Sequence, residues 1–371
     1  MKNKHIFILP LVLLSLLTGI FSGWFRIGWN LPISLPSGEH GALMVGSFLG
    51  TLICIERSVS YHNKAALFVP LVNGLSLIFF LLAMPKIAYI FLILGGAGLT
   101  GIYYIVYVKH KGIHILIMMA GAMCYLIGSA VLYNSSFYPA VVMWWIAFLF
   151  LTITGERLEL SRFILLKNKI KKQSVLIFLI SLFIVSILLP FHSDLGSSLS
   201  AVSMIGSAIW LFKYDMAKHS LKKPGQSFYS GMLLITGYCW LMLTGVFFAL
   251  GAYLGSFYDA SLHAFFLGFV FMMIFAHAPV ILPAVLKLGS SPFGKTLYMW
   301  YVLLNLTLIF RVSTFIPEVA AYKHWAGMLN GIAILGFFAN MIVLAKLARR
   351  KPKTAEANFL QENRQALPRQ C

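Results

Sequence analysis

Long apolar segments alternate with short polar ones along the whole chain, and this alternation constrains the fold more than any other feature. A helix needs roughly 20 apolar residues to cross the hydrocarbon core of a membrane. Hydrophobic residues make up 60% of the chain and charged residues only 11%, well below the roughly 25% charged that is usual in a soluble domain. Twelve segments of suitable length are centred on residues 5–25, 40–56, 66–84, 87–108, 113–133, 138–156, 173–190, 196–212, 229–251, 260–285, 296–315 and 325–346. The sequence therefore predicts an all-α polytopic membrane protein with about 12 transmembrane helices.

These segments leave no room for a soluble domain, so we expect one transmembrane domain over residues 1–347. Residues 348–371 are polar and basic and contain Pro352 and Pro368, a composition that predicts a disordered cytoplasmic tail. Such a tail is typically solvated and attracted to anionic lipid.

The net charge of +19 follows from an uneven distribution of Lys and Arg between the two sides of the membrane. Only Arg26, Lys86, Arg311 and Lys323 fall on the side opposite the N-terminus, and the other 25 of the 29 fall on the N-terminal side. Positive residues concentrate on the cytoplasmic side of membrane proteins. We therefore expect both termini in the cytoplasm of a bacterial-type inner membrane, with the lipid bilayer as partner and no nucleic acid.

The four cysteines do not suggest a disulfide framework or a thiolate metal site. Cys54, Cys124 and Cys239 lie inside apolar segments, Cys371 is the last residue, and none forms a CxxC pair.

The ends of three apolar segments suggest an internal repeat. The second ends in Glu56-Arg57, the sixth ends in Glu156-Arg157, and the tenth carries His277 near its end. These segments are four apart and run in the same direction. The pattern predicts three pseudo-repeated groups of four helices, with these ends in equivalent positions.

Two histidines lie at matching depth in the predicted membrane. His40 begins the second segment and His263 lies near the start of the tenth, and both segments run from the outer to the inner side. Ionisable groups inside a bilayer are costly and usually mark a site. Imidazole is a common axial ligand of haem iron. The pair predicts a six-coordinate haem b near the outer face; the alternative is two hydrogen-bonded packing residues.

Two arginines near the outer boundary fit the same hypothesis. Arg26 and Arg311 are candidates to bind the haem propionates, because arginine suits carboxylates well. Without haem, Arg26 is an ordinary interfacial anchor among tryptophans. In that case Glu318 or Glu39 is expected to neutralise the more deeply placed Arg311.

A second polar cluster is expected on the inner side. His277 follows His263 by 14 residues, or about 21 Å along a regular helix, and roughly 40° from the same face. This places it level with the two Glu–Arg pairs. One interpretation is an ion-pair network that joins three helices. The other is an uptake path for a proton or ligand from the cytoplasm, with His277 titrating near neutral pH or serving as a further metal ligand.

The run His40-Gly41-Ala42-Leu43-Met44 resembles the His-Gly-x-x-Met motif that opens the second helix in the catalytic subunit of the haem–copper oxidase superfamily. That resemblance implies that His40 ligates a low-spin haem, that His263 supplies the opposite ligand and that outer-side arginines bind the propionates. The chain is also similar to the NnrS group of twelve-helix haem membrane proteins, which is linked to nitric oxide metabolism.

The chain departs from the oxidase pattern where copper is bound. The sixth segment has Trp144 and Trp145 where the oxidases carry a copper-ligating histidine, and the seventh has no histidine. Ser261 replaces the first histidine of the oxidase His-x-His motif. We therefore expect no copper, no high-spin haem and no oxygen reduction of the oxidase type.

The sequence supports an integral membrane b-type haem protein that transfers electrons or handles or senses nitric oxide or another diatomic gas. Quinol or respiratory-chain proteins are its expected partners. One alternative is a cofactor-free transporter or channel that uses the inner Glu–Arg and His277 cluster as a relay. Another is an accessory subunit of a respiratory complex. The sequence leaves open whether the protein is an enzyme.

Overall fold

The computed structural model describes residues 7–31, 36–61, 65–161, 169–189, 193–254, 257–286 and 288–350. Every regular element within these ranges is a helix. The fold class predicted from the apolar segments is therefore confirmed: the chain is an all-α polytopic membrane protein. The predicted tail lies outside the described residues from position 351 onward.

Ten described helices are long and apolar enough to cross a membrane. In chain order they are α1 (Leu9–Arg26), η3 with α2 (Ala42–Gly50, Thr51–Tyr61), α4 (Pro85–His110), α5 (Ile113–Ser135), α6 (Tyr138–Leu160), α7 (Lys169–Leu188), α8 (Asp194–Tyr214), α10 (Gln226–Leu254), α11 with η6 and α12 (Tyr258–His263, Ala264–Val270, Phe271–Leu286), and α15 (Lys323–Arg350).

Two shorter apolar helices occupy the places of the predicted third and eleventh segments. They are η4 with α3 (Ala65–Leu67, Phe68–Leu81) and α13 (Leu297–Ser313). Three short helices lie in connections: η2 (Ser37–Glu39), α9 (Ala217–Ser220) and α14 (Pro317–Ala320). All twelve predicted segments therefore correspond to helices.

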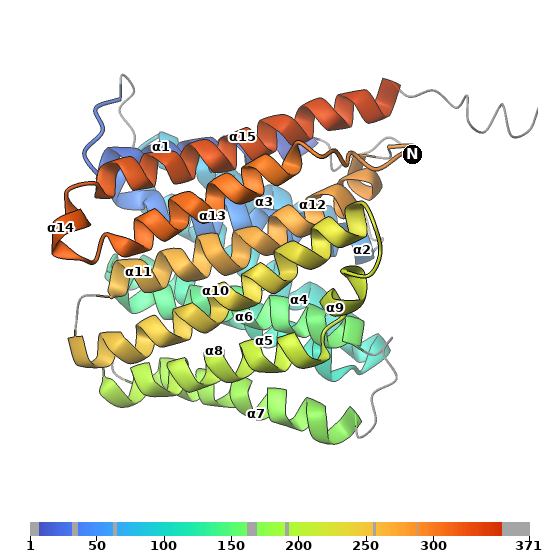
Figure 1. The fold of residues 1–371 in the computed structure, drawn as a ribbon, viewed down its shortest axis with the longest axis horizontal. Coiled ribbons are helices and arrows are strands. Elements are labelled where there is room, and N and C mark those ends of the chain that lie inside the picture. Colours follow the sequence, from blue (N-terminus) through green and yellow to red (C-terminus); the bar gives the residue numbers. More distant parts are fainter. Residues whose placement is uncertain are drawn as a thin grey trace, which may run out of the picture.

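The long helices lie side by side in a bundle, as Figure 1 shows. Along the chain, α3 packs against α4, α4 against α5, and α5 against α6. The run continues from α7 to α8 and α10, and α10 packs against η6 and α12. At the end of the chain, α13 packs against α15, and α15 also contacts α1, which brings the last helix beside the first.

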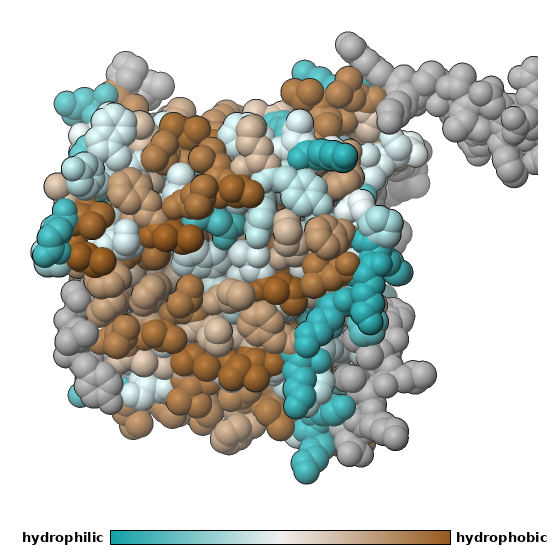
Figure 2. Space-filling model, viewed as in Figure 1, coloured by the Kyte–Doolittle hydropathy of each residue, from teal (hydrophilic) through white to brown (hydrophobic). Residues whose placement is uncertain are grey.

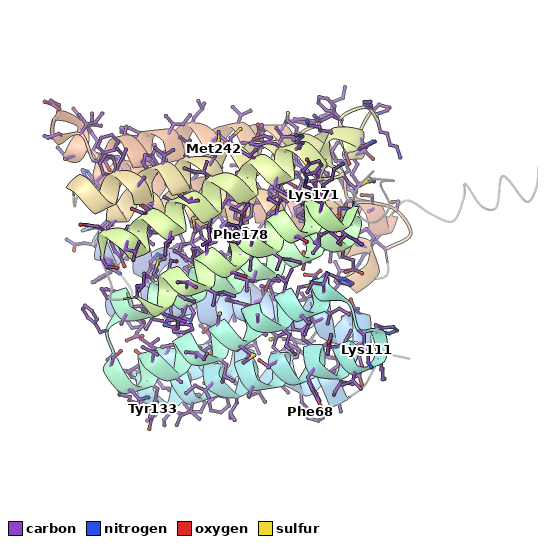
Figure 3. The ribbon with its side chains drawn as sticks, turned by 90° about the horizontal axis from the view of Figure 1, so that it is seen from below. Phe68, Lys111, Tyr133, Lys171, Phe178 and Met242 are labelled. Atoms are coloured by element: carbon purple, nitrogen blue, oxygen red, sulfur yellow. The ribbon has the colours of Figure 1, made fainter. Side chains whose placement is uncertain are left out.

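Side-chain character divides the surface as a membrane protein requires. In Figure 2 the middle of the visible face is largely hydrophobic, and hydrophilic side chains gather along the edge where α15 ends. Lys111 and Lys171 lie at that end of the bundle, whereas Tyr133 lies at the opposite end (Figure 3). We call the end of the bundle that contains Arg57 and Lys111 the Arg57 face. The opposite end, which contains His40 and Tyr133, is the His40 face.

Local sequence signals explain where several helices begin and end. Pro85 stands in the first turn of α4, where its missing N–H costs nothing. Lys111 ends the same helix in the left-handed conformation with φ 38°. The Ser193 hydroxyl caps α8 by accepting from the Gly196 N–H at 3.1 Å. These signals set the helix lengths and thus the level at which polar groups lie.

Two long helices contain π-helical segments, in which backbone hydrogen bonds span five residues instead of four. They are η3 (Ala42–Gly50), which begins two residues after His40, and η6 (Ala264–Val270), which begins directly after His263. π-Helices account for well under 1% of residues and occur often at functional sites. Two of them in matching places single out the His40 face.

Only two of the three helices in the predicted repeat share this π-helical feature. The second and tenth long helices share a histidine followed by a π-helix, whereas α6 is α-helical throughout Tyr138–Leu160. The repeat of four-helix groups stays a prediction.

Candidate functional site

The two histidines singled out in the sequence lie within electrostatic range of each other at the His40 face. His40 stands at the start of its helix, and His263 is the last residue of α11. The two imidazoles are near enough to interact electrostatically, and Arg26 and Arg311 are within the same range of His40. The structure thus gathers four sequence-predicted residues from α1, the second long helix, α11 and α13.

The imidazole of His40 is oriented by helix α1. Its Nδ1–H donates to the carbonyl oxygen of Gly19 at 2.7 Å. Gly23 lies one turn further along α1, and a Cβ atom there would come within 2.7 Å of His40 Cε1. Gly23 therefore lets the ring approach the α1 backbone, and the Gly19 carbonyl fixes the proton on Nδ1.

The imidazole of His263 is oriented from within its own helix. Its Nδ1–H donates to the Asp259 carbonyl oxygen, four residues earlier, at 2.8 Å. A carbonyl can only accept, so Nδ1 carries the proton and Nε2 keeps its lone pair in the neutral ring. Among the described residues, nothing hydrogen-bonds Nε2 of either His40 or His263. Both rings therefore hold the donor atom that a metal ion takes.

The charge of Arg311 is balanced by a residue that the sequence did not suggest. Its guanidinium donates from Nε and Nη2 to both carboxylate oxygens of Asp259, at 3.2 and 3.1 Å. A third donation from Nη1 reaches the Lys323 carbonyl at 3.0 Å. Arg311 is only 4% exposed, and such a bidentate pair compensates its burial. The expectation that Glu318 or Glu39 would neutralise Arg311 was wrong, because Asp259 lies directly opposite the guanidinium.

Glu39 instead accepts hydrogen bonds from two tyrosines. The hydroxyl of Tyr138 donates to Glu39 Oε2 at 2.6 Å and that of Tyr89 at 2.8 Å. These bonds tie α4 and α6 to the residue directly before His40, and so fix where the histidine enters the bundle.

Arg26 differs from Arg311 in having an exposed side chain. Among the described residues its guanidinium has no hydrogen-bond or ion-pair partner. Arg26 is close enough to Tyr258, at the start of α11, to interact with it electrostatically. Of the two predicted propionate partners, Arg26 is therefore the one whose charge is not already paired.

The predicted inner residues meet at the Arg57 face. The Arg57 guanidinium forms ion pairs with Glu56, at 3.3 Å, and with Glu156. The second pair joins α2 to α6. Arg57 and Glu156 keep 15% and 23% of their side-chain surface exposed, so the pair is largely withdrawn from solvent.

His277 belongs to the same cluster, through a contact that distinguishes it from the other two histidines. Its Nδ1–H donates to the Met273 carbonyl, as in His263. Its Nε2, however, accepts from Arg157 Nη2 at 2.7 Å. Because the lone pair of Nε2 is engaged, His277 links α6 to α12 and offers no free atom to a metal.

Arg157 has further neighbours directly after α8 and in α10. It lies in electrostatic range of Asp215 and Glu156. Asp215 accepts from the Tyr238 hydroxyl and from the Ala217 N–H, both at 2.8 Å. The inner cluster thus brings charged groups of opposite sign within electrostatic range of one another across the bundle, which offsets part of the cost of burying them.

The donor set at the His40 face fits a haem with two axial histidines. Each ring has its Nδ1–H fixed by a carbonyl, an arrangement that orients metal-ligating histidines, and each keeps Nε2. Arg26, which has no ion-pair partner among the described residues, supplies a positive charge nearby. No group of three or more His, Cys, Asp or Glu side chains suited to a metal ion occurs among the described residues. A haem held by two histidines needs none.

Sequence reasoning missed Asp259, the Gly19–Gly23 surface of α1 and both π-helices. Asp259 carried a usable signal, because it precedes His263 by one helical turn. Gly19 and Gly23 form a GxxxG spacing, which lets another group approach a helix closely. The π-helices had no comparable signal, since hydrophobicity does not report the hydrogen-bond register.

The chain belongs to the family DUF8744, described as a domain of unknown function, which matches residues 5–346. This range includes both polar clusters and the apolar helices up to residue 346 of α15. No curated protein matches the chain.

Proposed function

We propose that this DUF8744 member is a membrane electron-transfer protein that holds haem b between His40 and His263. The proposal rests on the hydrogen bonding that the two imidazole rings have in common. Each ring donates Nδ1–H to a carbonyl, and the Nε2 atom of each has no hydrogen-bond partner among the described residues. They stand on different helices within electrostatic range, each followed by a π-helix.

Residues of this chain would orient the two imidazoles, leave space for one ring and supply positive charge for the propionates. Gly19 and Asp259 orient the imidazoles through their carbonyls, and Gly23 leaves space for one ring. Arg26 is the proposed partner of a propionate, with Arg311 contributing positive potential while it stays bound to Asp259. When bound, haem supplies a one-electron couple whose potential depends on its axial ligands.

Electron transfer is the role that two axial histidines support best. His40 and His263 would both be taken up in holding the haem, and the one-electron couple that it would supply needs no further binding position for a substrate. The uneven distribution of Lys and Arg supports the orientation proposed with it, in which the Arg57 face and both termini are cytoplasmic. The His40 face would then lie at the outer side of a bacterial-type inner membrane, with quinol or respiratory-chain proteins as redox partners.

Absorption spectroscopy tests the proposal. The protein purified from haem-replete cells should show a b-type reduced-minus-oxidised spectrum. Both His40→Ala and His263→Ala should lower the haem-to-protein ratio by more than about tenfold, since even an outer-shell change costs 10–100-fold in metal affinity. The matched control is His277→Ala, which should keep the spectrum. A colourless wild-type protein would refute the proposal.

A further inference from the structure

A cavity of about 560 Å³ opens at the Arg57 face, at the opposite end of the bundle from the proposed haem. Four helix ends surround it: the last turns of α2, α4 and α6 and the first turn of α5. Its lining includes Arg57, Tyr103, Lys109, His114 and Glu159. Most of these residues lie outside the inner ion-pair network.

Two buried donors in the cavity wall have no acceptor in the described part of the chain. The hydroxyl of Tyr103 has no hydrogen-bond partner among the described residues, although Tyr103 is only 2% exposed. The Nε–H of Arg57 is also unpaired, and the guanidinium carbon lies 5.8 Å from the centre of the Tyr103 ring. Buried donors without acceptors are costly and rare in native proteins. A ligand that supplies acceptor oxygens would satisfy both.

The rim of the cavity is basic. Lys109 and His110 stand in the last turn of α4, and Lys111 follows as its cap. Lys109 Nζ lies 5.1 Å from the centre of the Tyr61 ring and, among the described side chains, has no carboxylate partner. The one acidic lining residue, Glu159, already faces His114, whose Nε2 is 3.8 Å away. An anion entering past Lys109 therefore meets positive charge first.

We propose that this cavity binds a phosphate group through Tyr103, Arg57 and Lys109. A phosphate oxygen accepts from the Tyr103 hydroxyl and the Arg57 Nε–H, and the ammonium of Lys109 closes the site from the rim. The same chemistry is offered by the headgroup of an anionic phospholipid and by a soluble phosphate. Basic pockets between helix ends are where membrane proteins bind such headgroups. The site does not depend on the proposed haem.

The experiment uses the full-length protein in a neutral detergent. Native mass spectrometry measures retention of phosphatidylglycerol, and calorimetry measures binding of inorganic phosphate. Wild-type protein is expected to bind at least one of the two. Retained lipid without phosphate binding identifies a headgroup site, and phosphate binding identifies a site open to soluble phosphate.

Three variants complete the test. Tyr103→Phe removes only the hydroxyl and should weaken binding at least about tenfold, because hydrogen bonds to charged groups are the strong ones. Lys109→Gln should weaken it too. Lys213→Gln is the matched control, since Lys213 also lies over a tyrosine ring, that of Tyr214, but outside the cavity. The proposal is overturned if wild-type protein binds neither probe, if Tyr103→Phe binds as tightly as wild type, or if Lys213→Gln loses as much as Lys109→Gln.

Discussion

The two polar clusters of this protein contain histidines with the same local geometry and different surroundings. His40, His263 and His277 each donate Nδ1–H to a backbone carbonyl. At the Arg57 face, the second nitrogen of His277 accepts a hydrogen bond from Arg157, so this ring is engaged within the ion-pair cluster. At the His40 face, the second nitrogens of the other two rings meet no described partner. The difference separates a histidine that joins two helices from two histidines that each keep a nitrogen for a ligand.

The backbone conformation near the histidines also differs between the two clusters. His40 and His263 each precede a π-helix, η3 and η6 respectively, whereas His277 lies within the α-helix α12. A π-helix is less stable than an α-helix and is found mostly at functional sites, where the unusual backbone serves the site. We therefore expect substitutions in the ion-pair network of the Arg57 face to affect stability first, and substitutions of His40 and His263 to affect ligand binding first.

The largest effect on stability is expected from Glu156→Gln. The change leaves the Arg57 guanidinium with one carboxylate instead of two in a largely buried setting. We expect a loss of about 3 kcal/mol, the lower end of the range for a broken buried pair, because both side chains keep some exposure. Unfolding in mixed detergent micelles measures it. The control Glu318→Gln changes an exposed carboxylate and should stay within about 0.5 kcal/mol. Equal effects of the two variants would contradict a stabilising role for the inner cluster.

A smaller effect is expected from Gly23→Ala at the His40 face. The new Cβ would lie 2.7 Å from His40 Cε1, so the ring must shift, at a cost of about 1–3 kcal/mol. The haem-to-protein ratio should fall with it. Gly101→Ala is the control, because a Cβ there meets nothing within 4 Å and should stabilise α4 by about 0.5–1 kcal/mol. If both variants keep the wild-type haem content, Gly23 does not position His40.

The smallest effect is expected from Lys323→Gln. Lys323 Nζ lies 3.4 Å from Asp259 Oδ1 but is 46% exposed, so this pair should contribute less than about 1 kcal/mol. Arg311, which binds the same carboxylate, is 4% exposed, and Arg311→Gln should cost several times more because it strands the partly buried Asp259. Thermal unfolding of the two variants compares them directly. A ranking in the opposite order would show that exposure does not decide the strength of these pairs.

The sequence was sufficient to predict the helices, because apolar length alone determines which segments can cross a membrane. It also singled out His40 and His263, since ionisable groups are rare in such segments. The partners of these residues could not be predicted. Arg311 binds Asp259, and Glu39 binds Tyr138, because helix packing decides which polar groups meet. The free second nitrogens were also beyond prediction, since a sequence contains no hydrogen-bond geometry.

The spacing argument for His277 assumed a regular α-helix between it and His263. The π-helix η6 interrupts that helix, so a step of 100° per residue does not apply across Ala264–Val270. His277 nevertheless reaches Arg157, as its expected depth required. Depth is the more robust inference, because it depends on the rise along the helix more than on the rotation around it.

Rescue of haem binding by free imidazole tests the central claim most directly. His40→Gly removes the ring and leaves the Gly19 carbonyl and the Gly23 surface of α1 in place. The account predicts that this variant is purified without haem, and that imidazole added with haem restores a six-coordinate, low-spin spectrum. His277→Gly should keep wild-type haem without imidazole. Full haem content in His40→Gly, or loss of haem in His277→Gly alone, would contradict the assignment of the free second nitrogens as ligands.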